Sequence, residues 1–431
     1  MFYGSCRFGT SIFMNMSSLA TVWIYNNHFA LNQTWNSIGN AVGKIVIAFS
    51  GFLFGYISDI LPPNMKLGKR KFFIWTGAPA LALSFVMLFI PHLFIPLNNQ
   101  VAVFSWLLIW NSLFNLFYGY LLTPYQSWMP EITGEDERIE VSALQNSSNL
   151  IATIVGLGFT FFIAGYLNEQ GGIDSKAGIV LLVSVVVFAV IEIMMFLPTL
   201  ISIKEKEIKP VERDIVNEIK TVMKNKNYVI WLIGQGIYSI GVTILLSLTL
   251  DFIEYIGLSG IVDFAIFGIS MFGTVMISFV FWGKLAKKIG KKKSLISGFL
   301  YSSLILPLTL VVGKLPFLPV NVQGYIFGFL MGLGLSSIYL FPYAIIADIA
   351  DKDSKETNEA RAGMYTGFNS IPLNIFQALA LLLIPLIHDP DNPNSLGLKW
   401  LGPIVSLFIL LSIPVIMFGD FDPFLKKIEV E

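Results

Sequence analysis

Residues 123–140 read TPYQSWMPEITGEDERIE, and residues 341–361 read FPYAIIADIADKDSKETNEAR. Each stretch begins with a Pro-Tyr pair, continues through apolar residues and contains a dense acidic run with an arginine. A second pair precedes them, with GYISDILPPNMKLGKRK at residues 55–71 and GKLAKKIGKKK at residues 283–293. Because both pairs recur in the same order at nearly the same separation, the chain is predicted to contain a duplicated structural unit.

The composition places this duplicated unit in a lipid bilayer. Of the 431 residues, 55% are hydrophobic, 14% are aromatic and 13% are charged, and the mean hydropathy is +0.71. An ordinary soluble domain carries roughly 25% charged residues. The net charge is zero, so the charge balance indicates no nucleic-acid partner. Cys6 is the single cysteine, which excludes an intramolecular disulfide.

Twelve apolar stretches are long enough to cross a hydrocarbon core of roughly 30 Å as helices. The predicted spans are residues 4–28, 37–59, 72–95, 101–126, 141–166, 177–200, 228–256, 262–283, 294–313, 321–348, 362–387 and 398–418. The first stretch lacks a small-residue cleavage site, so we expect a retained helix rather than a signal peptide. The sequence therefore predicts an all-α, multi-pass protein of the plasma membrane.

The distribution of Lys and Arg predicts the orientation. These residues lie at the termini or in the connections after the second, fourth, sixth, eighth and tenth spans, with the exceptions of Lys44, Lys176, Lys314 and Lys399. Short cytoplasmic loops retain positive charge, so both termini are expected to be cytoplasmic.

The longest polar interruption, residues 202–227, divides the chain into two six-helix bundles at residues 1–201 and 228–431. It is either a solvated linker or a short amphipathic helix at the membrane surface.

These motifs carry a family resemblance. The stretch at Gly283 resembles the signature loop of the major facilitator superfamily, and residues 55–71 resemble the same loop with an insertion. Within that superfamily, residues 124–138 and 342–361 resemble the glycoside, pentoside and hexuronide cation symporters, typified by melibiose permease. The resemblance covers nearly the whole chain. It implies two bundles of six helices, a central cavity near the membrane midplane, and rocking between outward-open and inward-open states.

The repeated loops are rich in charge, which suggests a gating role. A carrier needs contacts that form in one state and break in the other. We expect inter-bundle or helix-end ion pairs from Asp59, Glu131, Arg138, Asp348, Asp351 and Arg361. The alternative is that these charges complement helix dipoles.

Lys44 is a cation inside a predicted span, and charged groups there are candidate functional residues. Residues 44, 51 and 55 share one helix face, and its two glycines permit close approach or line a cavity. Lys44 is interpreted either as a cavity group or as a lysine whose stem extends to the membrane surface.

The resemblance also identifies what is missing. The cation-binding carboxylates of the family fall at Ile47 and Gly51, and its sugar-binding acids fall at Ser11 and Leu122. Its arginine falls at Asn146, and its lysine falls near Asn374 or Ile375. The family's sodium mechanism is therefore not expected. Lys44 either carries a proton as the coupling ion or pairs with an anionic solute such as a sugar acid.

Neutral polar side chains can build a hydrogen-bonding cavity for a sugar. The candidate solute-binding residues are Asn15, Ser18, Asn115, Tyr118, Gln126, Asn146, Asn149, Gln235, Tyr238, Tyr339 and Asn374, together with Lys44. Amides also join helices to one another in membranes, which is the alternative interpretation of each.

The sequence contains no enzymatic motif and no cofactor motif. Its three His residues are far apart, so they do not form a metal-ligand spacing. The sequence predicts a monomeric secondary transporter of a small polar solute, most simply a sugar or glycoside, with the lipid bilayer and a proton as its other partners. A lysolipid carrier of the same fold and a non-transporting solute sensor are the alternatives.

Overall fold

The computed structural model describes residues 2–62, 68–133, 135–203, 215–357 and 362–422. The chain forms two compact units, Met1–Glu212 and Arg213–Glu431. The described residues contain helices and turns but no strand. Long helices are expected in a bilayer because each satisfies its backbone hydrogen bonds internally.

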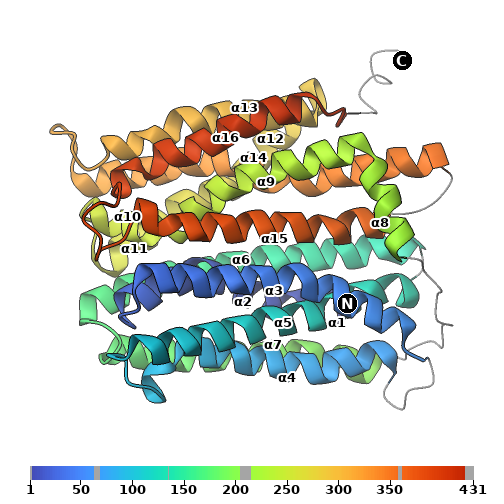
Figure 1. The fold of residues 1–431 in the computed structure, drawn as a ribbon, viewed down its shortest axis with the longest axis horizontal. Coiled ribbons are helices and arrows are strands. Elements are labelled where there is room, and N and C mark those ends of the chain that lie inside the picture. The colour runs from blue at the N-terminus through green and yellow to red at the C-terminus, as the bar shows by residue number, and fades with distance from the viewer. Residues whose placement is uncertain (1, 63–67, 134, 204–214, 358–361, 423–431) are drawn as a thin grey trace. The chain divides into compact units, whose positions relative to one another are not determined.

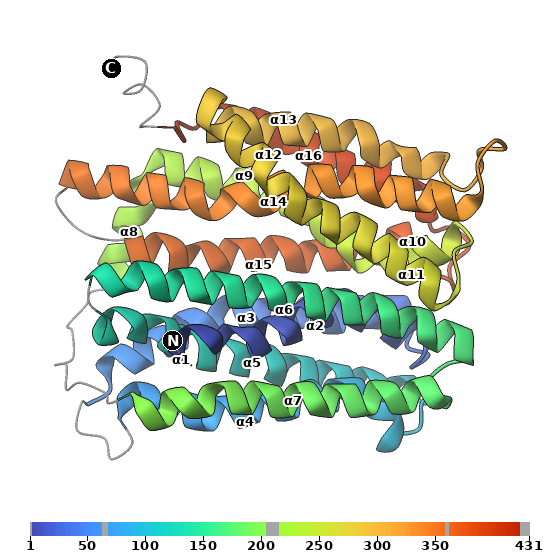
Figure 2. The same cartoon turned by 180° about the vertical axis from the view of Figure 1, so that it is seen from behind.

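In the first unit, the short helix α1 (Phe2–Ser5) is followed by long helices that run alongside one another (Figure 1). They are α2 (Arg7–Asn27), α3 (Gln33–Ile60), α4 (Lys69–Phe89), α5 (Gln100–Ile132), α6 (Glu135–Gln170) and α7 (Lys176–Ser202). Helix α2 packs against α6 and α7, α3 packs against α5, and α4 packs against α5 and α7. Helices α6 and α7 lie toward the viewer when the molecule is seen from behind (Figure 2).

The second unit begins with the short helix α8 (Ile215–Lys224), which lies in the segment interpreted from sequence as a linker or surface helix. Its other helices are α9 (Lys226–Ser247), α10 (Thr249–Tyr255), α11 (Gly260–Gly268), α12 (Thr274–Ile289), α13 (Lys291–Ile305), α14 (Val320–Thr357), α15 (Ala362–Ile387) and α16 (Leu401–Met417). A π-helical turn, Ile269–Gly273, joins α11 to α12, so that one predicted span is a continuous but irregular helix.

The two units repeat one packing pattern. In the second unit, α9 packs against α15 and α16, α12 packs against α14, and α13 packs against α14 and α16. The first unit contains the equivalent contacts, of α2 with α6 and α7, of α3 with α5, and of α4 with α5 and α7. The local geometry also repeats, because α4 and α13 both begin after a left-handed glycine, Gly68 (φ 82°) and Gly290 (φ 90°).

The predicted spans correspond to the observed helices, with one difference. Among the described residues, 11 helices are long and apolar enough to cross a membrane, and α2 is not one of them. Helix α2 has the required length of 21 residues, but Thr10, Ser11, Asn15, Ser17 and Ser18 make it too polar. The first span is therefore the most polar of the set, which is a functional signal in itself.

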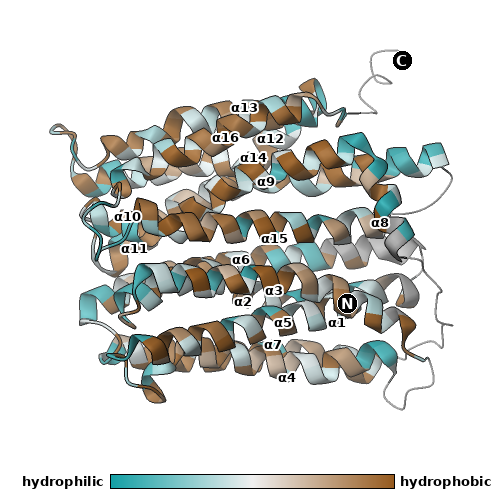
Figure 3. Ribbon diagram, in the orientation of Figure 1, coloured by the Kyte–Doolittle hydropathy of each residue, from teal (hydrophilic) through white to brown (hydrophobic). Residues whose placement is uncertain are grey.

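Apolar side chains cover the long helices, and polar residues gather at their ends. In Figure 3, brown predominates along the long helices, and teal marks the C-terminal end of α14. Aromatic rings fill the interior of the first unit, where Phe13 of α2 stacks on Phe85 of α4 with 3.9 Å between ring centroids.

Candidate functional site

A cluster of neutral polar side chains lies where α2 packs against α6. Asn15 Nδ2 donates to Ser11 O (2.7 Å) and to Thr153 Oγ1 (3.1 Å). Thr153 in turn donates to Asn149 O (2.8 Å). Ser18 is exposed, and its spacing from Ser11 and Asn15 places all three on one face of α2.

The same polar face continues along α6. Asn146 is exposed and Asn149 is half-buried, one helical turn apart. An exposed amide in a spanning helix is unfavourable against lipid, because the hydrocarbon offers it no hydrogen-bond partner. We call Asn15, Ser18, Asn146, Asn149 and Thr153 the polar face of unit 1, since this is the part of the unit suited to a polar solute.

A separate set of amides joins α3 to α5. Asn111 Nδ2 donates to Gly39 O (3.1 Å), and Asn115 Nδ2 donates to Asn111 Oδ1 (2.9 Å). Ser50 of α3 donates to Asn115 O (3.2 Å). Asn115 is only 6% exposed, so its hydrogen bonds within the protein contribute to helix packing in the way expected of amides in membranes.

The other predicted solute-binding residues of α5 are more accessible than Asn115. Tyr118 is half-buried, with its ring 6.5 Å from that of Phe114. Gln126 is exposed, one residue after Tyr125 of the repeated Pro-Tyr pair.

Lys44 lies on α3 about three turns after the helix begins at Gln33. Its side chain is half-buried, and no described residue forms a hydrogen bond or ion pair with it. The preceding Gly43 faces α5, where an added Cβ would lie 2.4 Å from Asn111 Nδ2. Lys44 therefore lies in the part of α3 where the adjacent Gly43 allows α3 to pack closely against α5.

In the second unit, several buried polar atoms have no hydrogen-bond partner among the described residues. They are Gln235 Oε1 and Tyr238 Oη of α9 and Asn369 Oδ1 of α15. Helices α9 and α15 pack closely, because an added Cβ at Gly236 would lie 2.3 Å from the ring of Phe376. Buried polar atoms are normally satisfied, so these groups are candidates for contact with water or solute.

The remaining predicted residues of this unit differ in their exposure. Asn374 of α15 is half-buried and donates to Ser370 O (2.8 Å). Tyr339 of α14 is 42% exposed. Ser370 and Asn374 on α15 have the spacing of Ser11 and Asn15 on α2. Helix α15 packs against α9, the first long helix of its unit, as α6 with Asn146 and Asn149 packs against α2.

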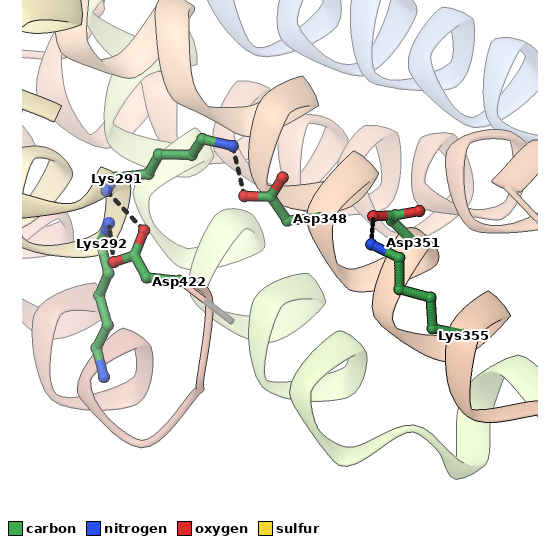
Figure 4. A network of polar contacts seen from close by, with 6 residues as sticks. All are labelled: Lys291, Lys292, Asp348, Asp351, Lys355 and Asp422. Atoms are coloured by element: carbon green, nitrogen blue, oxygen red, sulfur yellow. Dashed lines mark hydrogen bonds and ion pairs between the residues drawn. The ribbon is translucent and has the colours of Figure 1, made fainter. Parts of the chain in front are cut away.

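The repeated charged loop of the second unit holds an ion pair (Figure 4). Lys291 Nζ, at the start of α13, lies 2.5 Å from Asp348 Oδ2 on α14. Asp422 caps the same helix end by accepting hydrogen bonds from the backbone nitrogens of Lys291 (2.7 Å) and Lys292 (3.0 Å). Asp351 pairs with Lys355 (2.8 Å) within α14, and both side chains are more than half exposed.

The corresponding loop of the first unit is described only in part. Arg70 at the start of α4 is buried and donates to Ser58 Oγ of α3. Lys71 donates to Leu200 O of α7 (2.7 Å). The side chains of Asp59, Glu131 and Arg138 and the whole of Arg361 lie outside the described residues.

Sequence reasoning missed one charged residue. Glu192 of α7 is 0% exposed, so it lies within the protein at membrane depth. It is a single carboxylate in an apolar run, which is the signal that singled out Lys44. No group of three His, Cys, Asp or Glu in the described part of the chain could hold a metal ion.

Comparison with known families places the chain. Residues 2–387 match the family described as MFS/sugar transport protein. This chain belongs to that family of the major facilitator superfamily. The resemblance seen in the repeated loops is thereby confirmed, and the protein is a multi-pass, non-enzymatic secondary transporter of small solutes. No curated protein matches the chain.

Solved structures share its fold at low sequence identity. A D-xylose-proton symporter superposes with a TM-score of 0.70 and 14% identity over 99% of this chain and 97% of the other. The nucleoside transporter NupG gives 0.66 and 14% over 97% and 99%. A bacterial homologue of the human lysosomal transporter Spinster gives 0.67 and 11% over 97% and 95%.

Proposed function

We propose that this MFS transporter carries a small, neutral solute of the sugar or glycoside class and that a proton is its coupling ion. The observation that carries the proposal is the neutral character of the polar face of unit 1, where amides and hydroxyls are exposed at membrane depth. Amides both donate and accept hydrogen bonds, which matches the hydroxyls of a sugar. The family description and the similarity to a D-xylose-proton symporter support the same solute class.

The chemistry of α3 supports a proton rather than sodium. Sodium is a hard cation that prefers oxygen ligands, as calcium and magnesium do. Ile47 and Gly51 offer no side-chain oxygen at the two positions where the resembling symporters carry carboxylates. Transport is therefore expected to continue without sodium.

Lys44 is proposed to contact the solute. A half-buried ammonium with no partner in the described part of the chain retains its donors for a ligand, whether a sugar hydroxyl or the carboxylate of a sugar acid. The candidate gating residues Asp59, Glu131, Arg138, Asp348, Asp351 and Arg361 are proposed to make contacts that change during the cycle. One chain contains both units, so the monomer is proposed to be the transporting species.

Counterflow in proteoliposomes tests the solute class. Vesicles holding the purified chain are loaded with unlabelled compound, and entry of the labelled compound is measured for monosaccharides, glycosides, sugar acids, nucleosides and lysolipids. Sugars or glycosides should exchange. Exchange of lysolipids alone would replace the proposal with an amphiphile carrier, and binding of a sugar without exchange would indicate a sensor.

Two substitutions test the assigned residues. Asn15→Ala should raise KM by about tenfold, because it removes from the polar face of unit 1 an amide whose Oδ1 atom can accept a hydrogen bond from a solute hydroxyl. Asn27→Ala, at the exposed end of the same helix, is the matched control and should leave KM unchanged.

Lys44→Met keeps the length of the apolar stem and removes the charge. If Lys44 contacts the solute, this variant should weaken solute binding, most strongly for sugar acids. If Lys44 instead carries the coupled proton, the variant should exchange solute normally but lose pH-driven accumulation. A variant that matches the wild type in both measurements would return Lys44 to the interpretation of a lysine extending to the membrane surface.

A further inference from the structure

Glu192 is a carboxyl group enclosed by the first unit. It is 0% exposed, and neither of its carboxyl oxygens has a hydrogen-bond partner among the residues that the structure describes. It lies against Gly9 of α2, where an added Cβ would be 2.1 Å from Glu192 Oε2 and 2.7 Å from Glu192 Cα. The glycine thus makes room for a carboxyl group that packing alone does not need.

The second unit provides a comparison within the same chain. Gly234 of α9 lies against Ile416 of α16, where an added Cβ would be 2.7 Å from Ile416 Cγ1. Glu192 follows Gly178 of α7 by the same number of residues as Ile416 follows Gly402 of α16, and both glycines pack against a backbone carbonyl. An isoleucine with 0% exposure fills the equivalent place. The carboxyl group is therefore an addition to a contact that an apolar side chain completes by itself.

The groups that interact electrostatically with Glu192 come from α2, from α5 and from Cys6 between α1 and α2. Arg7 of α2 is the charged residue whose field acts on this carboxyl group, although no ion pair joins the two. Cys6 and Tyr125 also interact with it electrostatically, and the Cys6 thiol donates to Met195 O (3.3 Å).

The other neighbours of α7 contribute less charge near Glu192. Helix α4 contributes Lys71, whose ammonium is bonded to Leu200 O further along α7. Between α6 and α7, the rings of Phe159 and Phe188 lie 5.1 Å apart. Arg7 is therefore the described charge best placed to respond when Glu192 changes its protonation state.

We propose that Glu192 is a proton-binding site of the transport cycle. The proposal rests on the proposed function, since it names the residue that holds the coupled proton. A carboxyl group without a hydrogen-bond partner in an apolar interior is most stable when protonated, and it needs water or a cation when it is ionised. Loading takes one proton from water onto the carboxylate, and release returns one proton to water on the other side of the membrane.

Helix α2 links this proton to the solute. Gly9 touches Glu192, and Asn15 of the polar face lies less than two turns further along the same helix. Ionisation of Glu192 attracts Arg7, which begins α2, so the position of this helix depends on the proton. Coupling between two ligands requires a structural element with two positions whose equilibrium both ligands shift, and α2 is proposed to be that element for the proton and the solute.

The decisive measurement compares accumulation with exchange. Glu192→Gln should lower sugar accumulation driven by a pH gradient by at least about tenfold relative to counterflow, because counterflow needs no net proton movement. Glu192→Ile, which copies Ile416, should behave likewise and should remain folded. Asp174→Asn, an exposed carboxylate of the same unit, is the control and should keep the wild-type ratio. Equal accumulation in wild type and Glu192→Gln would overturn the proposal.

An infrared titration reads the proton directly and does not depend on transport. Difference spectra between acidic and alkaline buffer should contain a protonated-carboxyl band that is present in the wild type and lost in both Glu192 variants. Arg7→Gln should change the pH midpoint of this band and Arg7→Lys should restore it, whereas a purely structural arginine would leave the midpoint unmoved. A missing band would overturn the assignment of Glu192. A clear band without counterflow of any sugar would overturn the proposed function instead.

Discussion

At the scale of single residues, the two glycines that contact α7 and α16 differ in what they touch. A Cβ at Gly9 would meet the backbone of α7 at Glu192, whereas a Cβ at Gly234 would meet only a flexible side-chain atom of Ile416. Gly9→Ala should therefore destabilise the protein by about 1–3 kcal/mol, and Gly234→Ala should cost less.

Thermal unfolding in detergent measures this order. Gly158→Ala is the control, because nothing lies within 4 Å of a Cβ added at that position of α6. It should leave stability unchanged or raise it by up to about 1 kcal/mol, since alanine is the better helix former. A Gly234→Ala protein less stable than Gly9→Ala would contradict this account of the contact.

His388, after the end of α15, gives stability a pH dependence. Burial lowers the pKa of His388, and the nearby Asp389 raises it by a smaller amount. The unfolded chain therefore binds a proton more readily than the folded one, so this contribution is present above about pH 6.5 and is lost as the pH falls below that value. His388→Gln should flatten the acidic loss of thermal stability by about 2 °C. Asn394→Ala in the same loop is the control, and an unchanged acidic loss in His388→Gln would assign the dependence to other groups.

At the scale of helices, two of the ion pairs that the structure describes in the repeated charged loops are of different kinds. The Lys291–Asp348 pair joins α13 to α14, and the Asp348 side chain is 18% exposed. The Lys355–Asp351 pair lies within one helix and is exposed. Exposed pairs separated by one helical turn contribute about 0.3–0.5 kcal/mol, so Asp351 should matter less than Asp348.

Counterflow kinetics test this difference. Asp348→Asn should slow the maximal rate by up to about fivefold while changing KM by less than about twofold, because a contact worth about 1 kcal/mol that changes during the cycle alters the populations of states more than solute binding. Asp351→Asn is the matched control and should stay near the wild-type rate. Equal slowing in both variants would indicate a general effect of charge in the loop.

The helices themselves were largely predictable from sequence. Long apolar runs bounded by Lys, Pro and Gly located the spans to within a few residues, because the bilayer leaves a helix little alternative. The irregular turn at Ile269–Gly273 and the C-terminal end of α14 were not predicted, since no proline marks either point of the helix.

Side-chain partnerships were less predictable. Lys44 could be singled out because charge in an apolar run is rare, and Glu192 could have been found by the same rule. The packing of Asn115 and the cap that Asp422 provides depend on which helices are neighbours, and one sequence does not contain that information.

At the scale of the whole molecule, the duplication visible in the loops extends to the packing of every long helix. In the equivalent contacts α2–α7 and α9–α16, one contains Glu192 where the other contains Ile416. A duplicated fold thus provides its own comparison, in which a charged residue present in one copy and replaced by an apolar residue in the other points to function rather than to folding.

The duplication and the positive loops together predict the orientation of the chain. The end of α12 and the start of α13 are rich in lysine, whereas Lys314, before α14, is one of few cations at the opposite helix ends. The positive-inside rule therefore places Lys288 in the cytoplasm and Lys314 outside.

Cysteine labelling tests this orientation. The chain is a suitable background because Cys6, its single cysteine, is buried and hydrogen-bonded to Thr199 Oγ1 (3.2 Å). Lys314→Cys should react with a membrane-impermeant maleimide in intact cells, and Lys288→Cys should react only after the membrane is opened. The unmodified chain should stay unlabelled in both conditions. The reverse pattern of labelling would invert the topology and place the Lys291–Asp348 pair on the outer surface.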